Sequence, residues 1–194
     1  MTVGILLAAG QSTRFGSMKQ LATLPTGQTL LETSSKNLRA AIARVLIIVS
    51  DDAALIAHAT HIGRMHDCEV IINPRASEGM ATSIECAVRT TNNAATNNAA
   101  GWLIALADMP FIKPSSIATI AAALTNATQI IVPTYLGQRG HPVAFGASYA
   151  DELCLLTGDT GARDVINRHP LEVVLLPLDD AGILTDIDTP DIIS

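Results

Sequence analysis

The segment VGILLAAGQSTRFGSMKQL, residues 3–21, joins a short apolar run to a turn of small and polar residues. Residues 3–7 are continuously apolar, which is typical of a strand buried on both faces of a parallel sheet. Ala8, Ala9 and Gly10 follow directly, and such small residues let a ligand approach the backbone closely. The segment therefore predicts a buried strand followed by a loop at the sheet edge where α/β folds bind ligands.

The rest of the chain repeats this alternation of apolar runs and helical patterns. Further strands are expected at residues 45–49, 69–72, 102–106, 130–133 and 173–176, and helices at residues 29–43, 79–90 and 115–124. Continuously apolar strands that alternate with helices indicate a mostly parallel sheet covered by helices on both faces. The chain has 194 residues, so we expect a single domain over residues 1–194.

The composition excludes several classes of protein. With 48% hydrophobic residues and a mean hydropathy of +0.35, the chain is not intrinsically disordered. The net charge of −6 argues against a nucleic-acid partner, because displacing phosphate counterions needs a basic face. A small phosphorylated ligand remains compatible, since a few convergent cations can outweigh the net charge locally.

Targeting and cysteine patterns point to a cytoplasmic protein. No stretch approaches the about 18 uninterrupted apolar residues of a membrane span, so we expect no membrane partner. The apolar start is too short for the core of a signal peptide and has no basic segment before it. Cys68, Cys86 and Cys154 are widely spaced and form no CxxC pair, so we expect free thiols in a reducing compartment.

Three further features are interpreted as structural. Residues 91–100 contain TNNAA twice and read as a low-complexity surface loop or helix-end insertion, without chemistry. His58, His61 and His66 lie close in sequence, but a solvated helix and its following loop explains them better than a metal site. The pair Asp51-Asp52 is expected to cap the next helix.

The loop after the first strand also carries groups that suit a phosphate. Successive backbone N–H groups in such a turn form an anion-binding concavity. Ser12 adds a hydroxyl, and Arg14 and Lys19 add two cations. Neither the Walker A pattern GxxxxGK[ST] nor the dinucleotide pattern GxGxxG is present. The residues alone leave two alternatives open, a phosphate cradle and an ordinary glycine-bearing turn with two surface cations.

The sequence LAAGQSTRFGSMKQL, residues 7–21, resembles the signature loop of the MobA-like nucleotidyltransferases, LAxGxSxRxGxxK. This resemblance implies a Rossmann-like three-layer α/β/α fold of the nucleotide-diphospho-sugar transferase type, with a nucleoside triphosphate over the loop. The residues that it assigns to the nucleotide are Leu7, Ala8, Ala9, Gly10, Ser12, Arg14 and Lys19. Arg14 and Lys19 would hold the phosphates and, together with Asp108, form the catalytic set.

Carboxylates follow the fourth expected strand and recur near the C-terminus. Asp108 stands in ALADMPF, where a lone carboxylate is often a cap, but the segment resembles the family's metal-binding segment. The stretch DIDTPD from residue 186 reads equally well as a helix start. Its resemblance to the family's DxDTP segment implies a second metal contact, for which we choose Asp188, with Asp186 as the alternate. Mg²⁺ is the expected metal, since it prefers one or two carboxylates plus phosphate oxygens and water.

Two polar loops resemble the molybdenum cofactor cytidylyltransferase (MocA-like) branch of the family. They are GQRGHPV, a turn leading into a strand at residues 137–143, and GDTGAR, a loop leading into a helix at residues 158–163. The acceptor-binding residues that this resemblance implies are Arg139, Gly140, His141, Pro142, Asp159 and Arg163. The first loop reads LAAG rather than LAGG, and the Ala9 methyl would narrow the base site and favour CTP. Gly79 and Ser83 would lie near the nucleotide, although a simple helix start explains them equally well.

The resemblance implies transfer of the nucleotidyl group of CTP to a phosphate of the molybdenum cofactor molybdopterin, with release of pyrophosphate. Such catalysis depends mainly on positioning and charge neutralisation. GTP, or a sugar or polyol phosphate as acceptor, is the main alternative. Some relatives of this branch are described as oxidoreductases of small heterocycles, but no nicotinamide fingerprint is present. A non-catalytic maturation chaperone is the other alternative, and a molybdoenzyme or its chaperone is a further candidate partner.

Overall fold

The computed structural model describes residues 1–10, 18–92 and 99–188. Its strands are β1 (Thr2–Leu7), β2 (Val45–Val49), β3 (Glu69–Ile72), β4 (Gly101–Leu106), β5 (Ile130–Tyr135), β6 (Gln138–Arg139), β7 (Val143–Gly146) and β8 (Val173–Pro177). Its helices are α1 (Leu30–Ala41), α2 (Ala53–His66), α3 (Met80–Thr91), α4 (Pro114–Ala123), α5 (Ala150–Cys154) and α6 (Arg163–Arg168). Short 3-10 turns are η1 (Lys19–Leu21), η2 (Ala76–Glu78), η4 (Ala147–Tyr149) and η5 (Ala181–Leu184).

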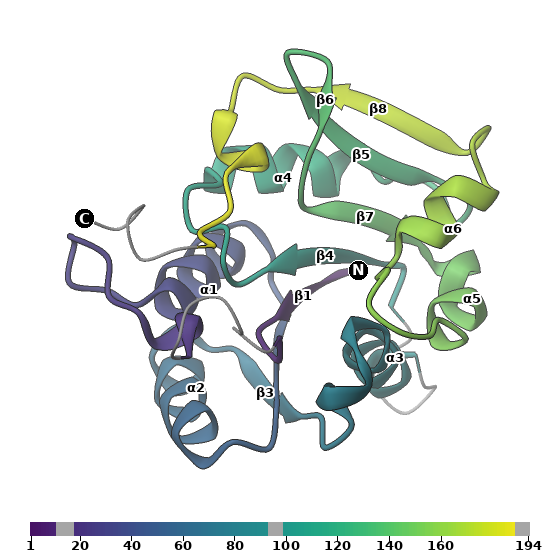
Figure 1. The fold of residues 1–194 in the computed structure, drawn as a ribbon. Helices are drawn as coiled ribbons and strands as arrows, with labels where there is room; N and C mark the ends of the chain where they lie inside the picture. The colour runs from purple at the N-terminus through teal and green to yellow at the C-terminus, as the bar shows by residue number, and fades with distance from the viewer. Residues whose placement is uncertain (11–17, 93–98, 189–194) are drawn as a thin grey trace.

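The strands form one mixed sheet with the order β3-β2-β1-β4-β7-β5-β6, and β8 pairs with β5 (Figure 1). β1 runs parallel to both of its neighbours, β2 and β4. The chain moves from β1 outward through β2 and β3, and then returns to the other side of β1 to form β4. This reversal of strand order is a topological switch point, where open α/β sheets bind their ligands.

Helices cover both faces of the sheet (Figure 1). α1, α2 and α4 contribute buried residues to one hydrophobic core, and α3, α5 and α6 contribute to a second core on the other face. β1 supplies both cores alternately, because successive side chains of a strand point to opposite faces: Leu6 joins the first core, and Ile5 and Leu7 the second. The expected three-layer α/β/α architecture is confirmed.

The sheet departs from a purely parallel arrangement around β7. β7 lies antiparallel between β4 and β5, and β5 and β6 form an antiparallel hairpin. Leu136 and Gly137 turn this hairpin with φ values of 48° and 79°. Short connections of this kind can join only antiparallel strands, whereas parallel strands need a long crossover. β7 is the strand expected after GQRGHPV. Its apolar residues did not reveal that it runs antiparallel to its neighbours.

The repeat at residues 91–100 is only partly a loop. Thr91 is the last residue of α3 and is fully buried, which corrects the expectation that the surface segment begins there. Its hydroxyl donates to the Ala87 carbonyl at 2.8 Å and accepts from the Trp102 indole at 2.8 Å. Ala99 is also buried. The first threonine of the repeat therefore anchors α3 to β4, while residues 93–98 lie outside the described part.

The features interpreted as structural have structural roles. The side chain of Asp52 caps α2 and accepts from the amides of Ala54 and Leu55, both at 2.9 Å. His58 lies on α2 with Nε2 2.8 Å from Oγ1 of Thr29. The three cysteines are free and half-buried. Among the helices of the described residues, none combines the length and the apolar character that crossing a membrane requires.

Candidate functional site

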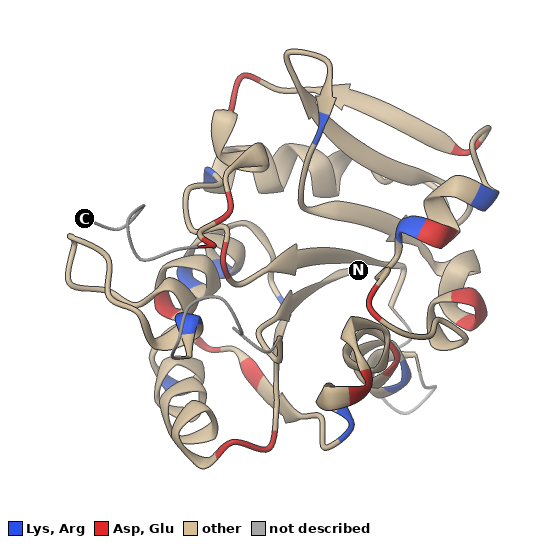
Figure 2. Cartoon of the chain, viewed as in Figure 1, with Lys and Arg blue, Asp and Glu red and all other residues tan. Residues whose placement is uncertain are grey.

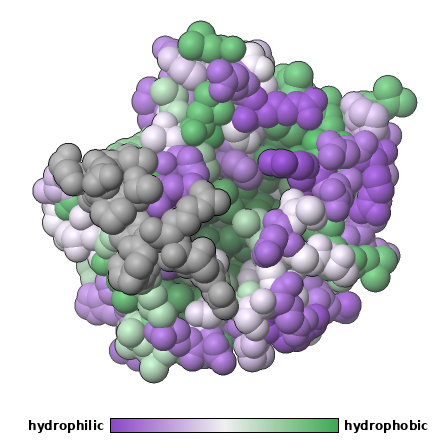
Figure 3. Space-filling view, viewed as in Figure 1, coloured by the Kyte–Doolittle hydropathy of each residue, from purple (hydrophilic) through white to green (hydrophobic). Residues whose placement is uncertain are grey.

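A pocket of about 560 Å³ opens at the carboxyl ends of β1 and β4. The residues that line it are Leu7, Ala9, Gly10, Lys19, Gln20, Ala76, Ser77, Gly79, Met80, Ser83, Leu106, Ala107, Asp108 and Asp159. Figure 3 shows this face of the molecule, where hydrophobic residues line a hollow rimmed by hydrophilic ones. The volume is within the range of small-molecule sites, and the lining combines apolar residues with several polar and charged side chains.

Register in the sheet brings the first loop beside Asp108. Leu7 at the end of β1 pairs with Leu106 at the end of β4, and the amide of Ala107 donates to the Leu7 carbonyl at 3.1 Å. The two chains therefore leave the sheet side by side. Their following residues, the small Ala9 and the charged Asp108, both reach the pocket.

Lys19 joins two carboxylates that are far from it in sequence. Its Nζ lies 2.7 Å from Oδ2 of Asp108 and 2.9 Å from Oδ1 of Asp188. The side chains of Lys19 and Asp108 are only 15% and 21% exposed, so solvent screens this ion pair weakly. Burial alone would lower the pKa of Lys19, but hydrogen bonds and charges from both carboxylates outweigh it and raise that pKa. Lys19 therefore stays a cation.

A buried isoleucine positions Asp188. Ile187 is fully buried and packs with Leu24 and Leu30 in a small core of its own, and its amide donates to the Asp108 carbonyl at 2.9 Å. This contact fixes the backbone next to Asp188 against the end of β4. The acidic positions after β4 and after η5 accordingly gather in one region in Figure 2. Residues 185–188 are neither helix nor strand. The helix expected with Asp188 or Thr189 as its N-cap and Pro190 in its first turn lies outside the described residues.

Asp108 has an oxygen available for a further ligand. Its Oδ1 atom is buried and has no hydrogen-bond partner among the described residues. Buried polar atoms are rarely left unpaired, so such an atom needs a reason. A divalent cation fits it, because carboxylate oxygens are ligands that Mg²⁺ prefers. The described residues contain no group of three or more His, Cys, Asp or Glu side chains that could hold a metal by itself.

The first-loop residues that were expected to contact the nucleotide fall into three groups. Leu7, Ala9 and Gly10 line the pocket. Ala8 instead packs in the core, and its amide donates to the Ile48 carbonyl at 2.9 Å, so that N–H is not available to an anion. Ser12 and Arg14 are in the same loop, but both lie outside the described residues.

The start of α3 forms the opposite wall of the pocket. Gly79 and Ser83 line it together with Asp159. Asp159 Oδ1 accepts a hydrogen bond from the amide of Met80 at 3.2 Å. A Cβ atom on Gly79, whose φ is +116°, would lie 2.5 Å from the Gly158 carbonyl oxygen. The GDTGAR loop thus packs directly on α3. Asp159, expected at the acceptor, lines the same pocket as Gly79 and Ser83, expected at the nucleotide.

The GQRGHPV segment packs His141 against η5. The His141 amide donates to the Ile183 carbonyl at 2.9 Å, and its buried Nδ1 has no partner among the described residues. Burial lowers the pKa of His141, the charges of Asp108 and Asp186 raise it, and that of Arg163 lowers it. Asp186 itself is exposed. His141 is not among the residues that line the pocket.

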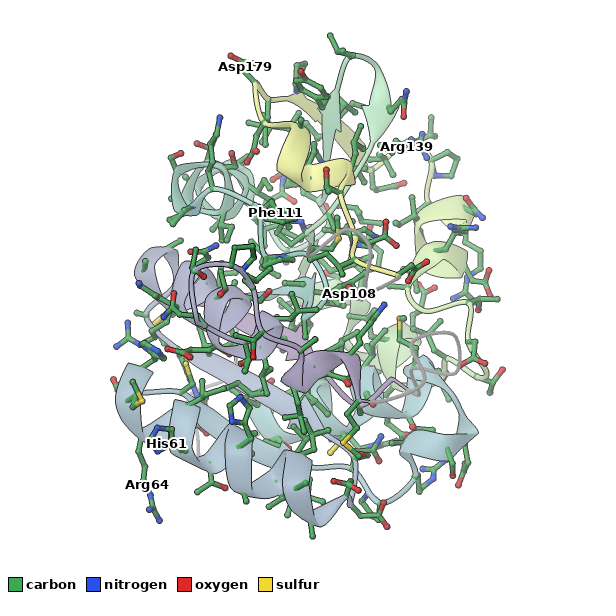
Figure 4. All side chains as sticks on the ribbon, turned by 60° about the vertical axis from the view of Figure 1, so that its left-hand side comes forward. His61, Arg64, Asp108, Phe111, Arg139 and Asp179 are labelled. Carbon is green, nitrogen blue, oxygen red and sulfur yellow. The ribbon has the colours of Figure 1, made fainter. Side chains whose placement is uncertain are left out.

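The remaining acceptor candidates spread from the interior to the surface. Gly140 and Pro142 are buried, and a Cβ atom on Gly140 would lie 2.4 Å from the carbonyl oxygen of Ile183. Arg139 and Arg163 are exposed. In Figure 4 Asp108 lies near the centre of the molecule, with Arg139 towards its periphery. The structure therefore brings Lys19, Asp108 and Asp188 together, but leaves the two arginines outside that cluster.

Sequence reasoning missed two buried amides at this site. Gln20 lines the pocket, is 6% exposed, and donates from Nε2 to the Gly10 carbonyl at 2.8 Å. It thus ties the beginning of the first loop to its end. Asn73 is 3% exposed and donates from Nδ2 to Oγ1 of Thr82 and Oγ of Ser83, at 2.9 and 3.0 Å. Gln20 directly follows the last fixed position of the first-loop pattern, and the resemblance assigned no role to it or to Asn73. Only burial distinguishes the two from ordinary polar loop residues.

Several characterised proteins are similar to this chain. The purine catabolism protein PucB of Bacillus subtilis is 28% identical over 97% of this chain and 92% of its own length. The nicotine blue oxidoreductase of Paenarthrobacter nicotinovorans is 24% identical over 96% and 91%. A probable molybdenum cofactor guanylyltransferase of Rhodopirellula baltica is 28% identical over 67% and 59%. These names belong to chemically different activities, so similarity to any one of them does not assign a substrate.

The fold and the family agree with these similarities. The crystal structure of Rv0371c from Mycobacterium tuberculosis in complex with manganese matches with a TM-score of 0.75, at 28% identity over 98% of this chain and 94% of that one. Residues 4–173 match the model of the MobA-like NTP transferase domain. The pocket-lining residues, with Lys19 and Asp108 among them, lie within the matched residues, whereas Asp188 lies beyond them. This chain is therefore a nucleotidyltransferase that belongs to the MobA-like NTP transferase family.

Proposed function

We propose that the enzyme transfers the nucleotidyl group of CTP to a terminal phosphate of molybdopterin bearing its molybdenum, with Mg²⁺ as the metal. An oxygen of the acceptor phosphate attacks the α-phosphorus of CTP, the bond between that phosphorus and the bridging oxygen breaks, and pyrophosphate leaves. The observation that carries the proposal is the convergence of Lys19, Asp108 and Asp188 beside the pocket. A cation and two carboxylates at this place suit a reaction that is driven by positioning and charge neutralisation.

Asp108 and Asp188 are the residues that would hold the metal. The unpaired Oδ1 of Asp108 supports this assignment. When bound, Mg²⁺ supplies charge neutralisation for the phosphates. A manganese complex of a related mycobacterial protein supports the use of a divalent cation. Asp186 stays the alternate ligand, and Asp188 is preferred because its Oδ1 contacts the same lysine nitrogen as Asp108.

Lys19 and Arg14 would neutralise the charge that develops on the leaving pyrophosphate. Lys19 lines the pocket, and the Asp108 carboxylate holds its ammonium group. The flexible side chain of the lysine would let this group move towards a bound phosphate. Gln20 would support Lys19 by holding the Gly10 carbonyl at the start of the same loop. Ser12, Gly79 and Ser83 complete the proposed nucleotide contacts.

The choice of CTP rests on Ala9. Its side chain lines the pocket and is almost fully buried, so a methyl group occupies space that a glycine would leave to a larger base. One buried methyl group discriminates substrates by only about 10- to 200-fold. GTP is therefore the principal alternative, and the similarity to a probable guanylyltransferase is the observation that favours it.

His141, with the flanking Gly140 and Pro142, is the proposed contact for the acceptor, because its Nδ1 has no hydrogen-bond partner among the described residues. Arg139 and Arg163 would reach the acceptor's anionic groups from the rim. Asp159 lies across the pocket, at the start of α3. A sugar or polyol phosphate would suit the same groups, so the acceptor must be tested directly.

The test is pyrophosphate release from each of the four nucleoside triphosphates with Mg²⁺, with and without molybdenum-loaded molybdopterin. The proposal expects release with CTP, dependent on the acceptor, and conversion of the acceptor to its cytidylyl form. Release with GTP alone would refute the choice of nucleotide. No release with any triphosphate would instead favour a maturation chaperone, or the redox activity named for one relative.

A further inference from the structure

The ammonium of Lys19 occupies the place where a bridging metal would bind. Its nitrogen lies 2.7 and 2.9 Å from one oxygen of Asp108 and one of Asp188. Mg²⁺ would sit about 2.0–2.1 Å from each of its ligand oxygens. A cation that bridges the same two oxygens must therefore occupy nearly the same space as the nitrogen. The unpaired Oδ1 of Asp108 stays open to a metal, but a divalent cation there would share the Asp108 carboxylate with the ammonium, and the two positive charges would repel each other.

The two cations also compete for the same negative charge. Two neighbouring carboxylates need a counter-ion, and the half-buried setting of Asp108 strengthens that need. Removing the ammonium without replacing it would leave two like charges facing each other. In the described structure the Lys19 ammonium is a counter-ion of this pair, so a divalent cation that enters alone meets a positive charge that is already bound there.

A nucleotide offers the displaced ammonium a new partner. Lys19 lines the pocket as well as contacting the carboxylates, and its four-carbon stem lets the nitrogen move between the two. The triphosphate also supplies oxygens that the metal needs, because no group of three or more protein ligands exists among the described residues. One ligand therefore removes both obstacles to metal binding.

We infer that Lys19 keeps the divalent cation off the Asp108–Asp188 pair until a nucleotide arrives, so that nucleotide and metal bind cooperatively. The inference rests on the proposed function, since it assumes that this pair holds the metal and that this pocket holds the triphosphate. Coupling of this kind is reciprocal, so the metal must tighten nucleotide binding by the same factor. The enzyme would then be charged with metal only when substrate is present.

The test is a titration of free Mn²⁺, followed by its electron paramagnetic resonance signal, without nucleotide and with a CTP analogue that carries a methylene between the α- and β-phosphorus atoms. Without nucleotide, Lys19→Gln should bind Mn²⁺ at least about tenfold more tightly than the wild type, which corresponds to about 1.4 kcal/mol. Lys36→Gln, which removes one exposed lysine elsewhere, should behave as the wild type. Lys19→Arg keeps the cation and should bind Mn²⁺ as weakly as the wild type.

The nucleotide analogue should tighten Mn²⁺ binding by a larger factor in the wild type than in Lys19→Gln. The double variant Lys19→Gln/Asp108→Asn should not show the tighter Mn²⁺ binding of Lys19→Gln, because one of the two carboxylates is then missing. Circular dichroism of each variant establishes that it is folded. Binding by Lys19→Gln that is equal to or weaker than that of the wild type, without nucleotide, would overturn the inference.

Failure of the inference and failure of the proposed function give different results. If only the lysine exchange is wrong, Asp108→Asn still abolishes the Mn²⁺ binding that exceeds the amount bound by the analogue without protein, but Lys19→Gln does not bind Mn²⁺ more tightly than the wild type. If the metal assignment is wrong, Asp108→Asn leaves Mn²⁺ binding unchanged in both conditions.

Discussion

Replacement of Asp180 should cost the protein a large part of its stability. This carboxylate is 2% exposed and accepts three hydrogen bonds. The donors are the amide of Lys113 at 2.9 Å, Oγ of Ser116 at 2.7 Å and the amide of Gly182 at 3.0 Å. It thereby fixes the start of α4 to η5, the turn that leads towards Asp188. Its loss would act on both the fold and the site.

The three bonds set the size of the effect. Hydrogen bonds to a charged group contribute about 1.5–3 kcal/mol each, but such contributions are not additive when the partners share one site. For Asp180→Ala we expect a loss of about 3–5 kcal/mol, against a total stability of about 5–15 kcal/mol for a domain. Asp180→Asn should lose about 2 kcal/mol. The amides of Lys113 and Gly182 donate to different oxygens of Asp180. In either orientation of the asparagine side chain, its NH₂ group therefore replaces one accepting oxygen and faces a backbone N–H donor.

Urea unfolding at pH 7, followed by circular dichroism, measures these losses. Asp179 is the matched control, because it is the adjacent residue, carries the same charge and is exposed. Asp179→Ala should change the free energy of unfolding by less than about 0.5 kcal/mol. The expected order of stability is wild type and Asp179→Ala, then Asp180→Asn, then Asp180→Ala. An Asp180→Ala protein within about 1 kcal/mol of the Asp179→Ala control would refute the role assigned to this carboxylate.

Three further predictions concern the pocket, the small core and a thiol. In Gly79→Ala the added Cβ atom would lie 2.5 Å from the Gly158 carbonyl oxygen, at a residue with a positive φ. The free energy of unfolding should fall by about 2 kcal/mol, and the KM for the nucleotide should rise. An unchanged KM would contradict the placement of Gly79 at the nucleotide. Ile187→Ala should cost about 2–5 kcal/mol in urea unfolding and weaken Mn²⁺ binding in the presence of nucleotide, because Asp188 loses its buried neighbour. Burial raises the pKa of Cys68 to about 11, so in a Cys86→Ala/Cys154→Ala background the thiolate absorbance should appear near pH 11. The stability that the neutral thiol contributes should be lost as the pH rises through that value. Titration near pH 9 would show that the thiol is not buried.

Much of the fold follows from local patterns in the sequence. The apolar runs of β1, β2 and β4 predicted buried strands, because a strand covered on both faces has no polar positions. Since parallel strands end at one edge, the position of Asp108 after β4 predicted its place beside the first loop. The direction of β7 could not be predicted in the same way, because an apolar strand reads identically in either orientation.

The contacts of the site were harder to predict than its location. Lys19 and Asp188 are 169 positions apart, and the buried side chain of Ile187 brings them together through tertiary packing. Ala8 and Ala9 are identical residues in one loop, yet only Ala9 lines the pocket, because the amide of Ala8 continues the pairing with β2. Gln20 and Asn73 act through burial, which a sequence does not specify for polar residues.

The central claim is that Lys19, Asp108 and Asp188 form the reaction centre of a metal-dependent nucleotidyltransferase. The most direct measurement is acceptor-dependent release of pyrophosphate from CTP and Mg²⁺ by wild type, Asp108→Asn, Asp188→Asn and Asp186→Asn at saturating substrate. Turnover should fall at least about 100-fold in Asp108→Asn and Asp188→Asn, as for the loss of other groups that stabilise transition-state charge, and by much less in Asp186→Asn. Turnover by Asp108→Asn close to that of the wild type, or a greater loss in Asp186→Asn than in Asp188→Asn, would contradict this assignment.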